Sequence, residues 1–325
     1  KTLPYYFLLS AHEAEQLSWS RLTVKPALDS VLASTSELKG GARPVLELKP
    51  EGAVDGGVLY KAEIPTDVLG EEGASLTLET TLNHVTVALP STVKQTEPQL
   101  FLWSGDVAIR SPYPTVTGRI KVKAATPKIV AFHPSDATKS GSIVTFGPFS
   151  NTPPSTSVEQ GTVHFQADTP RATIVTLDRT AEISHWGDAL SITDRILLRN
   201  SGPQLKGHFS RIEHQMASFY NRASGSALSS LSFTLPAGVR DPWFIDQIGN
   251  VSTSRFRASA PDPALVAAST GLPSSSAKLS LLELQPRFPL LGGWNYTFSI
   301  GYTLPLSLGG WTKQLFGSYD YVTAV

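Results

Sequence analysis

Proline and glycine divide this chain into short segments. The sequence holds 24 prolines and 25 glycines among its 325 residues. Because each proline removes an amide donor and clashes with the preceding helical turn, few long helices can form. Between these residues lie short runs rich in Val, Ile, Thr, Tyr and Phe, many of them alternating with period two, which is typical of strands bounded by turns. The sequence therefore predicts a mainly β fold, sandwich-like, with a few short helices.

Strand-like runs occur in both halves of the chain, with three helical stretches among them. The helices are expected at residues 12–19, 27–32 and 211–221. Two stretches rich in Ser, Pro and Ala or Thr, 150–159 and 260–278, are expected to be mobile loops. The strands are expected at 5–9, 22–24, 45–48, 58–64, 76–82, 85–89, 100–103, 107–109, 119–123, 128–132, 143–146, 163–165, 173–177, 181–185, 190–198, 228–235, 279–284, 296–304 and 319–322.

A faint internal repeat relates the two halves. Residues 76–82 resemble residues 298–304, with an offset of 222, and each run follows a Leu-Gly pair. Two weaker matches precede it: 60–64 matches 281–285 with a slip of one residue, and 7–9 matches 233–235. A duplication of this kind predicts two similar β domains in tandem.

We expect two domains, residues 1–172 and 173–325, as the chain length also suggests. If the repeat is a duplication, its second copy begins near Thr173, well before Phe233. The first copy has only six residues before Phe7. We therefore expect the N-terminal strands of the first domain, and the C-terminal part of the second, to lie outside this chain.

Charge and cysteine content exclude several kinds of chemistry. Lys plus Arg and Asp plus Glu are both 27, so the net charge is zero and gives no electrostatic reason to bind nucleic acid or an anionic membrane. Cysteine is absent, which excludes disulfides, thiolate nucleophiles and cysteine-ligated metals. No apolar run approaches the roughly 20 residues that span a bilayer.

Sequence motifs give no catalytic or cofactor site. His12-Glu13-Ala14-Glu15-Gln16 begins like the zinc-protease motif H-E-x-x-H, but Gln16 replaces the second imidazole ligand. Ser-x-x-Lys occurs three times without the Ser-Asp-Asn and Lys-Thr-Gly partners of a serine acyl-enzyme. The histidines lack ligand spacing, and His185 beside Trp186 is expected to be packed. We therefore predict a non-enzymatic chain with no cofactor and no metal.

Two N-x-S/T sequons are present, at Asn250-Val251-Ser252 and Asn295-Tyr296-Thr297. In a luminal protein, Asn250 is the better acceptor for an N-glycan, because residues 248–250 have the composition of a turn. Asn295 leads directly into a strand, so it is expected to be less accessible.

Several strings in this sequence, in the same order and approximate spacing, resemble the ribophorin I family, subunit 1 of the eukaryotic oligosaccharyltransferase. The resemblance covers about residues 100–302, with weaker support before. In physical terms these strings are Gly/Pro turns with aromatic residues, and Trp186, Phe209, Phe288 and Trp294 are expected to anchor the core. The strings are Ser-Pro-Tyr-Pro-Thr at 111–115, Phe-Gly-Pro-Phe at 146–149, Glu-Ile-Ser-His-Trp-Gly at 182–187, Leu-Lys-Gly-His-Phe-Ser-Arg at 205–211, Asp-Gln-Ile-Gly-Asn-Val-Ser-Thr-Ser at 246–254 and Pro-Arg-Phe-Pro-Leu-Leu-Gly-Gly-Trp at 286–294.

The resemblance implies two luminal β domains of a type I membrane protein in the endoplasmic reticulum, whose transmembrane helix lies outside this chain. It implies a non-catalytic role that stabilises the complex, with glycosyl transfer carried out by another subunit. The implied partners are the catalytic and other subunits of oligosaccharyltransferase. Presentation of nascent acceptor polypeptides is a further role that the resemblance leaves open. The segment 260–278 is longer than expected for animal members and suggests a fungal-like variant.

Three other interpretations of the sequence remain open. One is a non-catalytic β-sandwich binding module related to the N-terminal domains of zinc aminopeptidases. Another is a secreted sandwich that binds carbohydrate or protein, for which exposed tryptophans would provide platforms. The third is a hydrolase that the motifs do not reveal.

Overall fold

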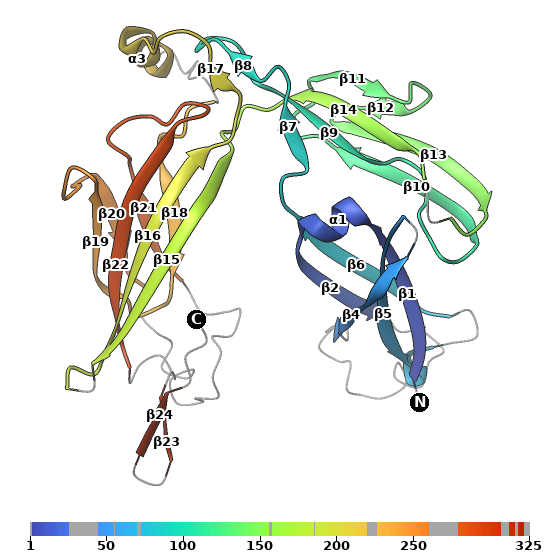
Figure 1. Ribbon diagram of the computed structural model, residues 1–325, viewed down its shortest axis with the longest axis horizontal. Coiled ribbons are helices and arrows are strands. Elements are labelled where there is room, and N and C mark those ends of the chain that lie inside the picture. The colour runs from blue at the N-terminus through green and yellow to red at the C-terminus, as the bar shows by residue number, and fades with distance from the viewer. Residues whose placement is uncertain are drawn as a thin grey trace. The chain divides into compact units, whose positions relative to one another are not determined.

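A computed structural model describes residues 2–25, 45–54, 56–69, 73–155, 158–184, 186–219, 226–259, 279–306, 312–315 and 318–321. Within these ranges the chain is mainly β with two short α-helices, which confirms the predicted fold class (Figure 1). The expected helix at 27–32, the expected loop at 260–278 and His185 lie outside the described residues.

The chain forms two compact units. The first contains Lys1–Leu89 and Leu100–Ala167, and the second contains Pro90–Gln99 and Asp168–Val325. A short segment from the first half therefore belongs to the second unit, a feature that the sequence did not reveal. The predicted domain limits, 1–172 and 173–325, stay a prediction about which parts fold independently.

The N-terminal part of the first unit is a small sandwich of two three-stranded sheets, ordered β1-β5-β4 and β3-β2-β6. Its buried apolar residues include Val24, Ile64 and Val68, packed against partly buried Tyr5, Leu46 and Leu76. The elements are β1 (Thr2–Ser10), α1 (Ala11–Gln16), β2 (Leu17–Lys25), β3 (Val45–Leu46), β4 (Leu48–Val54), β5 (Gly57–Pro65), the 3-10 helix η2 (Thr66–Val68) and β6 (Ser75–Leu82).

The rest of the first unit is a second sandwich, with sheets ordered β10-β13-β12 and β11-β14-β9-β7. Phe101, Val144, Phe146 and Val163 are buried within it. Its strands are β7 (Thr86–Ala88), β9 (Leu100–Asp106), β10 (Thr115–Lys123), β11 (Ile129–His133), β12 (Thr138–Ser140), β13 (Ile143–Thr152) and β14 (Gln160–Gln166).

The second unit places a four-stranded sheet, β15-β16-β22-β19, against a three-stranded sheet, β18-β21-β20. Phe244, Leu282, Leu284, Phe298 and Ile300 are among the most buried side chains of this core. Its elements are β8 (Thr92–Val93), β15 (Ala172–Ser184), β16 (Ala189–Asn200), β17 (Gln204–Leu205), α3 (Arg211–Phe219), β18 (Leu231–Leu235), β19 (Arg240–Asp246), β20 (Ser254–Arg257), β21 (Ser280–Leu284), β22 (Asn295–Pro305), β23 (Thr312–Leu315) and β24 (Ser318–Tyr321).

Strand pairing supports the internal repeat. In the first unit β1 and β4 flank β5, and β2 pairs with β6; in the second unit β18 and β20 flank β21, and β19 pairs with β22, all antiparallel. Leu22 pairs with Leu78, and Phe244 pairs with Ile300, so both strands carry the same offset of 222. If Phe7 is placed on Phe233, their partners Tyr60 and Leu282 also differ by 222. The pairing thus removes the one-residue slip that the sequence match required.

Several local expectations were wrong. Trp186 is not a core anchor, because its side chain is 102% exposed relative to a reference Trp. Phe288 is 39% exposed, and its ring packs edge-on against Trp294. The helix expected at 12–19 ends at Gln16, after which Trp19 belongs to β2. Residues 107–109 are not a strand, and β13 extends to Thr152, into the expected loop. The helix expected at 211–221 is confirmed over Arg211–Phe219.

Candidate functional site

The turn before Asn250 is held by several side-chain hydrogen bonds. Strand β19 ends at Asp246, whose Oδ1 accepts hydrogen bonds from the backbone N–H of Ile248 at 3.0 Å and of Gly249 at 3.1 Å. Gly249 has a φ of 141°, a conformation that side chains rarely adopt and that glycine permits. An aspartate accepting from amides two and three residues ahead is the usual way to fix such a turn.

Arg287 holds this turn from the other side. Its Nε donates to Asp246 Oδ2 at 2.5 Å, and its Nη2 donates to the carbonyls of Gly249 at 3.3 Å and Asn250 at 2.9 Å. The hydroxyl of Tyr296 donates to the same carboxylate oxygen at 3.2 Å. Arg287 therefore fixes the backbone of the sequon itself.

These contacts shift the pKa values of the groups involved. Burial alone would raise the pKa of Asp246, but the hydrogen bonds from Arg287 and from the Ile248 and Gly249 amides outweigh it and hold that pKa below its usual value. Burial, together with the Asp246 charge, raises the pKa of Tyr296 to about 12. Asp246 is thus a carboxylate and Tyr296 a neutral hydrogen-bond donor across the physiological range.

The two sequons lie in different environments. Asn250 is exposed and forms an isolated antiparallel bridge with Ile245. The buried Val251 follows it, and Ser252 is again exposed. Asn295 is also exposed, but it is the first residue of β22, opposite Arg199 of β16. Its Thr297 lies within the paired part of β22, opposite Leu197. In the first sequon Asn250 and Ser252 are exposed and Val251 between them is buried, whereas the Asn295 sequon enters a central strand of the sheet.

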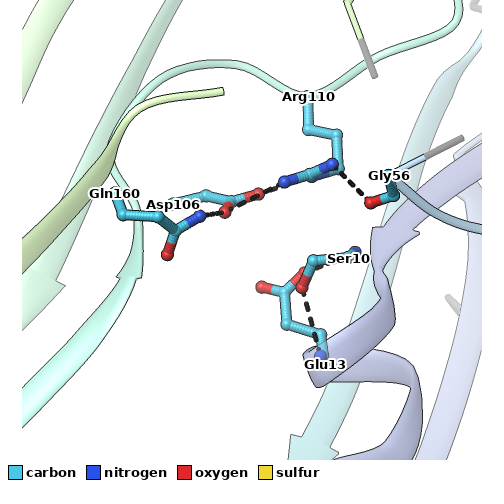
Figure 2. Close-up of polar contacts among 6 residues, drawn as sticks. All are labelled: Ser10, Glu13, Gly56, Asp106, Arg110 and Gln160. Carbon is cyan, nitrogen blue, oxygen red and sulfur yellow. Dashed lines mark hydrogen bonds and ion pairs between the residues drawn. The ribbon is translucent and has the colours of Figure 1, made fainter. Parts of the chain in front are cut away.

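The residues that begin like a zinc-protease motif cap a helix. Glu13 accepts hydrogen bonds from the Ser10 backbone at 3.0 Å and hydroxyl at 2.9 Å, and its own N–H donates to the Ser10 hydroxyl at 3.1 Å (Figure 2). This reciprocal arrangement is a capping box. His12 Nε2 lies 3.0 Å from the Gln16 amide nitrogen. The Glu13 carboxylate, which would be the base in a protease, here accepts hydrogen bonds from Ser10 at the start of the helix.

Arg110 ties two parts of the first unit together. Its Nε donates to Asp106 Oδ2 at 2.6 Å, and its Nη1 donates to the carbonyl of Gly56 at 2.9 Å (Figure 2). Gln160 also donates to the Asp106 carboxylate. Nearby in the same unit the rings of Tyr5 and Tyr113 stack with centroids 4.9 Å apart. The ring of Tyr113 belongs to the Ser-Pro-Tyr-Pro-Thr string, so that string has a packing role between the two sandwiches.

The segment Pro90–Gln99 is fastened to the second unit by backbone and side-chain bonds. β8 pairs in parallel with β17, and Gln95 exchanges two hydrogen bonds with the backbone of Ser210, its Nε2 to the carbonyl at 2.9 Å and its Oε1 from the N–H at 2.8 Å. Ser210 immediately precedes helix α3 and caps the N–H of Glu213 at 3.3 Å. No signal in the sequence identified this pairing, because a two-stranded parallel bridge has no length or periodicity to detect.

The turn Leu-Gly-Gly-Trp at 291–294 packs against Pro203 and Leu205, at strand β17. A Cβ added to Gly292 would lie 1.8 Å from the carbonyl oxygen of Pro203, and Leu205 N–H donates to the carbonyl of Gly292 at 3.3 Å. Only glycine fits this close backbone approach. Phe209 and Trp294 pack beside it with ring centroids 5.8 Å apart. Two of the strings that carried the family resemblance therefore contact each other directly.

The remaining candidates are separated from one another. In the described part of the chain no three His, Asp or Glu side chains come together in a metal-binding arrangement. His164 Nε2 lies 2.8 Å from the Leu89 carbonyl oxygen, and His214 packs against Phe209. No described helix has the length and apolar character needed to cross a membrane.

The described residues thus form a protein of the β-sandwich class, in which Asp106, Asp194 and Asp246 are each paired with an arginine. Comparison with known proteins identifies the family within that class. The sequence matches the Ribophorin I family over residues 1–325. The chain belongs to the ribophorin I family, as the resemblance predicted.

Relatives from plants and an animal agree with this assignment. The chain is 33% identical over 258 residues to dolichyl-diphosphooligosaccharide–protein glycosyltransferase subunit 1B of Oryza sativa subsp. japonica, covering 78% of this chain and 50% of that protein. It is 32% identical over 285 residues to subunit 1B of Arabidopsis thaliana, covering 86% and 57%. It is 28% identical over 269 residues to subunit 1 of Caenorhabditis elegans, covering 82% and 42%. The chain thus spans about half the length of these relatives.

Proposed function

We propose that this chain is a non-catalytic part of subunit 1 of an oligosaccharyltransferase, and that it supports N-linked glycosylation by stabilising the complex. Its partners are the catalytic and other subunits, and its location is the lumen of the endoplasmic reticulum. The observation that carries the proposal is membership of a family whose relatives are named as subunits of this transferase. Presentation of acceptor polypeptide is the second part of the proposed role.

The geometry supports a structural role for the groups that could otherwise do chemistry. The Glu13 carboxylate caps a helix, Asp106 binds Arg110, and Asp246 binds Arg287 and Tyr296. Each of these carboxylates holds a turn or helix start in place, and each is bound by donors that keep it occupied. Such groups contribute to folding and to the shape of surfaces, which is what a stabilising subunit requires.

The proposed assembly is tested by affinity purification of the tagged full-length protein from its native membranes in mild detergent. The eluate is assayed for transfer of a lipid-linked glycan to a sequon peptide. We expect transferase activity to co-purify together with a polytopic catalytic partner. A full-length protein that elutes without activity and without other subunits would contradict the proposal.

The non-catalytic role is tested by single substitutions in the same preparation. His185→Ala and Glu13→Gln are expected to leave transfer unchanged at equal amounts of complex. Loss of transfer in a variant that still assembles would identify a catalytic contribution from this subunit and overturn the proposal.

We further propose that Asn250 carries an N-glycan. Its side chain is exposed, its sequon lies between the strands β19 and β20, and Arg287 donates a hydrogen bond to its backbone carbonyl. Digestion with peptide N-glycosidase followed by peptide mass spectrometry should find a glycan at Asn250. Asn250→Gln should abolish one mobility shift on a gel, and Asn295→Gln serves as the matched control. A glycan found only at Asn295 would refute the assignment.

A further inference from the structure

Strand β15 forms one edge of the four-stranded sheet in the second unit. It pairs with β16 from Ala172, opposite Asn200, to Ser184, opposite Ala189. Figure 1 shows it as the outermost strand of the β15-β16-β22-β19 sheet. Among the described residues no strand pairs with its other side. All its residues except Thr173 are exposed, so a row of backbone N–H and C=O groups faces outward.

The two edges of this sheet differ. The opposite edge strand, β19, contains Pro242, an irregularity between Arg240 and Trp243, and a positive φ at Asp241. Proline and bulges are devices that prevent another strand from adding to an edge. In β15 the only irregularity lies between Ile174 and Thr176, and from Thr176 to Ser184 the pairing is continuous and free of proline. One edge is blocked and the other is open.

The apolar side chains on the inner face of β15 extend past the region that the sheet β18-β21-β20 covers. Leu190 and Ile196 of β16 are 2% and 3% exposed, whereas their cross-strand partners Ile183 and Leu177 in β15 are 37% and 49% exposed. The sheet β18-β21-β20 therefore covers β16 but leaves the apolar side chains of β15 half-exposed. An extended segment alongside β15 could place its alternate side chains over Leu177 and Ile183.

The charged residue on the inner face of β15 does not prevent a segment from packing on these apolar side chains. Arg179, between Leu177 and Ile183 on the inner face, binds the buried Asp194 of β16 with bonds of 2.7 and 2.9 Å. The inward-pointing carboxylate is thus paired within the sheet. The other face of β15 presents Thr176, Asp178, Thr180 and Glu182, all polar and exposed.

We propose that the β15 edge binds an extended acceptor polypeptide as an additional strand. Main-chain hydrogen bonds provide the attachment, and apolar residues at alternate positions pack on Leu177 and Ile183. Main-chain pairing does not depend on sequence, which suits acceptor proteins of many sequences. The polar outer face and half-exposed inner side chains keep the edge soluble when empty, unlike the more apolar surfaces of permanent subunit interfaces. This inference rests on the proposed function and gives it a binding site.

The test is site-specific photo-cross-linking in native membranes, with the full-length protein assembled in its complex. Benzoylphenylalanine replaces the exposed Glu182 on β15 or, as the control, the exposed Arg240 on the blocked edge β19. The probe is a radiolabelled secretory precursor bearing one sequon and arrested during translocation. We expect cross-links to the precursor from position 182 and none from position 240.

A second variant tests the edge itself. Leu177→Lys places an unpaired charge on the inner face, a device that natural edges use against strand addition. We expect it to lower the cross-link yield from position 182 roughly five- to tenfold. Val116→Lys, on the 76% exposed Val116 of edge strand β10, is the matched control and should leave the yield unchanged.

The outcomes separate this inference from the proposed function. An unchanged yield in Leu177→Lys, or equal cross-links from both edges, would overturn acceptor binding at β15. Cross-links from position 182 to another subunit would also overturn it and make the edge a subunit interface. Failure of the unsubstituted protein to co-purify with transferase activity would instead refute the assembly role. Precursor cross-links that require an open β15 edge, in an assembled complex, support both.

Discussion

The two copies of the internal repeat share their strand pairing but bury very different amounts of apolar surface. In the first copy the sheet β3-β2-β6 ends at β6, and the described core is small, with Val24, Ile64 and Val68 buried. In the second copy the strand equivalent to β6 is β22, and the hairpin of β15 and β16 continues the sheet beyond it. The core of that copy includes the aromatic residues Phe244, Tyr296 and Phe298.

The difference shows what the additional hairpin does. β16 contributes Leu190, Ile192, Ile196 and Leu198 to the core of the second unit, all 6% exposed or less. It also gives β22 a neighbour on each side, so that its backbone groups are paired in both directions. A wider sheet therefore stabilises the same topology through both burial and hydrogen bonding. The prediction that equivalent strands precede β1 stays a prediction.

The largest expected effect comes from equivalent core positions. Phe298 is 2% exposed and contacts the rings of Phe233, Phe244 and Tyr296, so Phe298→Ala should destabilise the second unit by about 3–5 kcal/mol. Leu76 is its half-buried equivalent, and Leu76→Ala should cost about 1–2 kcal/mol in the first unit. Urea denaturation followed by hydrogen exchange and mass spectrometry reports on each unit separately. Equal losses in both units would show that the small core is as important as the large one.

Hydrogen exchange tests the strand neighbours directly. The amides of β6 that point away from β2 should exchange roughly 100-fold faster than the corresponding amides of β22, because only β22 has a partner on that side among the described strands. The matched control is β5 against β21, each of which lies between two strands in its own sheet. Equal protection of β6 and β22 would mean that another segment covers the β6 edge in solution.

Much of the fold could be predicted from sequence where period-two runs are long. The runs at 190–198 and 296–304 correspond to β16 and β22, and the sequence repeat alone relates β6 to β22. β19 was missed, because Pro242 within it argues against a central strand and only its edge position permits it. Over the described residues, the predicted runs 173–177 and 181–185 fall on one long strand, Ala172–Ser184. The polar residues between the two runs resemble a break in the sequence pattern, although they belong to an exposed edge strand.

The candidate site was only partly predictable. Asn250 and Asn295 are both exposed, so the greater accessibility expected of Asn250 stays a prediction. The turn before Asn250 followed from the local composition. The brace from Arg287 did not, because it joins residues about 40 positions apart and depends on how β19 and the turn before β22 come together. Exposure of tryptophan was equally hidden. Trp186 is followed by a glycine and Trp294 is preceded by one, so their sequence surroundings look alike. Only the structure shows that Trp186 is exposed at a hairpin tip and that Trp294 lies in an aromatic cluster.

The segment Pro90–Gln99 supports the second unit through side-chain and backbone hydrogen bonds. Gln95 is 8% exposed and satisfies both backbone groups of Ser210, so Gln95→Ala should destabilise the start of α3 by roughly 1–3 kcal/mol. Hydrogen exchange of α3 measures the effect, and the exposed neighbour Lys94→Ala is the control. If α3 exchanges at the same rate in both variants, the helix is held by other contacts.

A smaller effect, dependent on pH, is expected from Asp246 of the second copy. Asp246 and Val24 are at equivalent positions, opposite Phe298 and Leu76, so the ion pair with Arg287 replaces an apolar contact. The pKa of Asp246 is lowered in the folded protein, so its ion pair stabilises the second unit above the pKa of the unfolded chain, about 3.9. This stabilisation is lost as the pH falls through the pKa of the folded protein. Asp246→Asn should lower Tm of the second unit at pH 7 and flatten its fall toward pH 3. An unchanged acid profile would show that other carboxylates set it.

The smallest effect is expected at the tip of the hairpin that distinguishes the two copies. Trp186 is fully exposed, so Trp186→Ser should change the free energy of unfolding by no more than about 0.5 kcal/mol. Trp294→Ser, in the cluster with Phe209 and Phe288, is the contrasting variant and should cost several times as much. Thermal denaturation of the two variants at one pH measures both. A large loss on removing Trp186 would mean that the hairpin tip folds back on the molecule, and the hairpin would then stabilise the second copy through its tip as well as through β16.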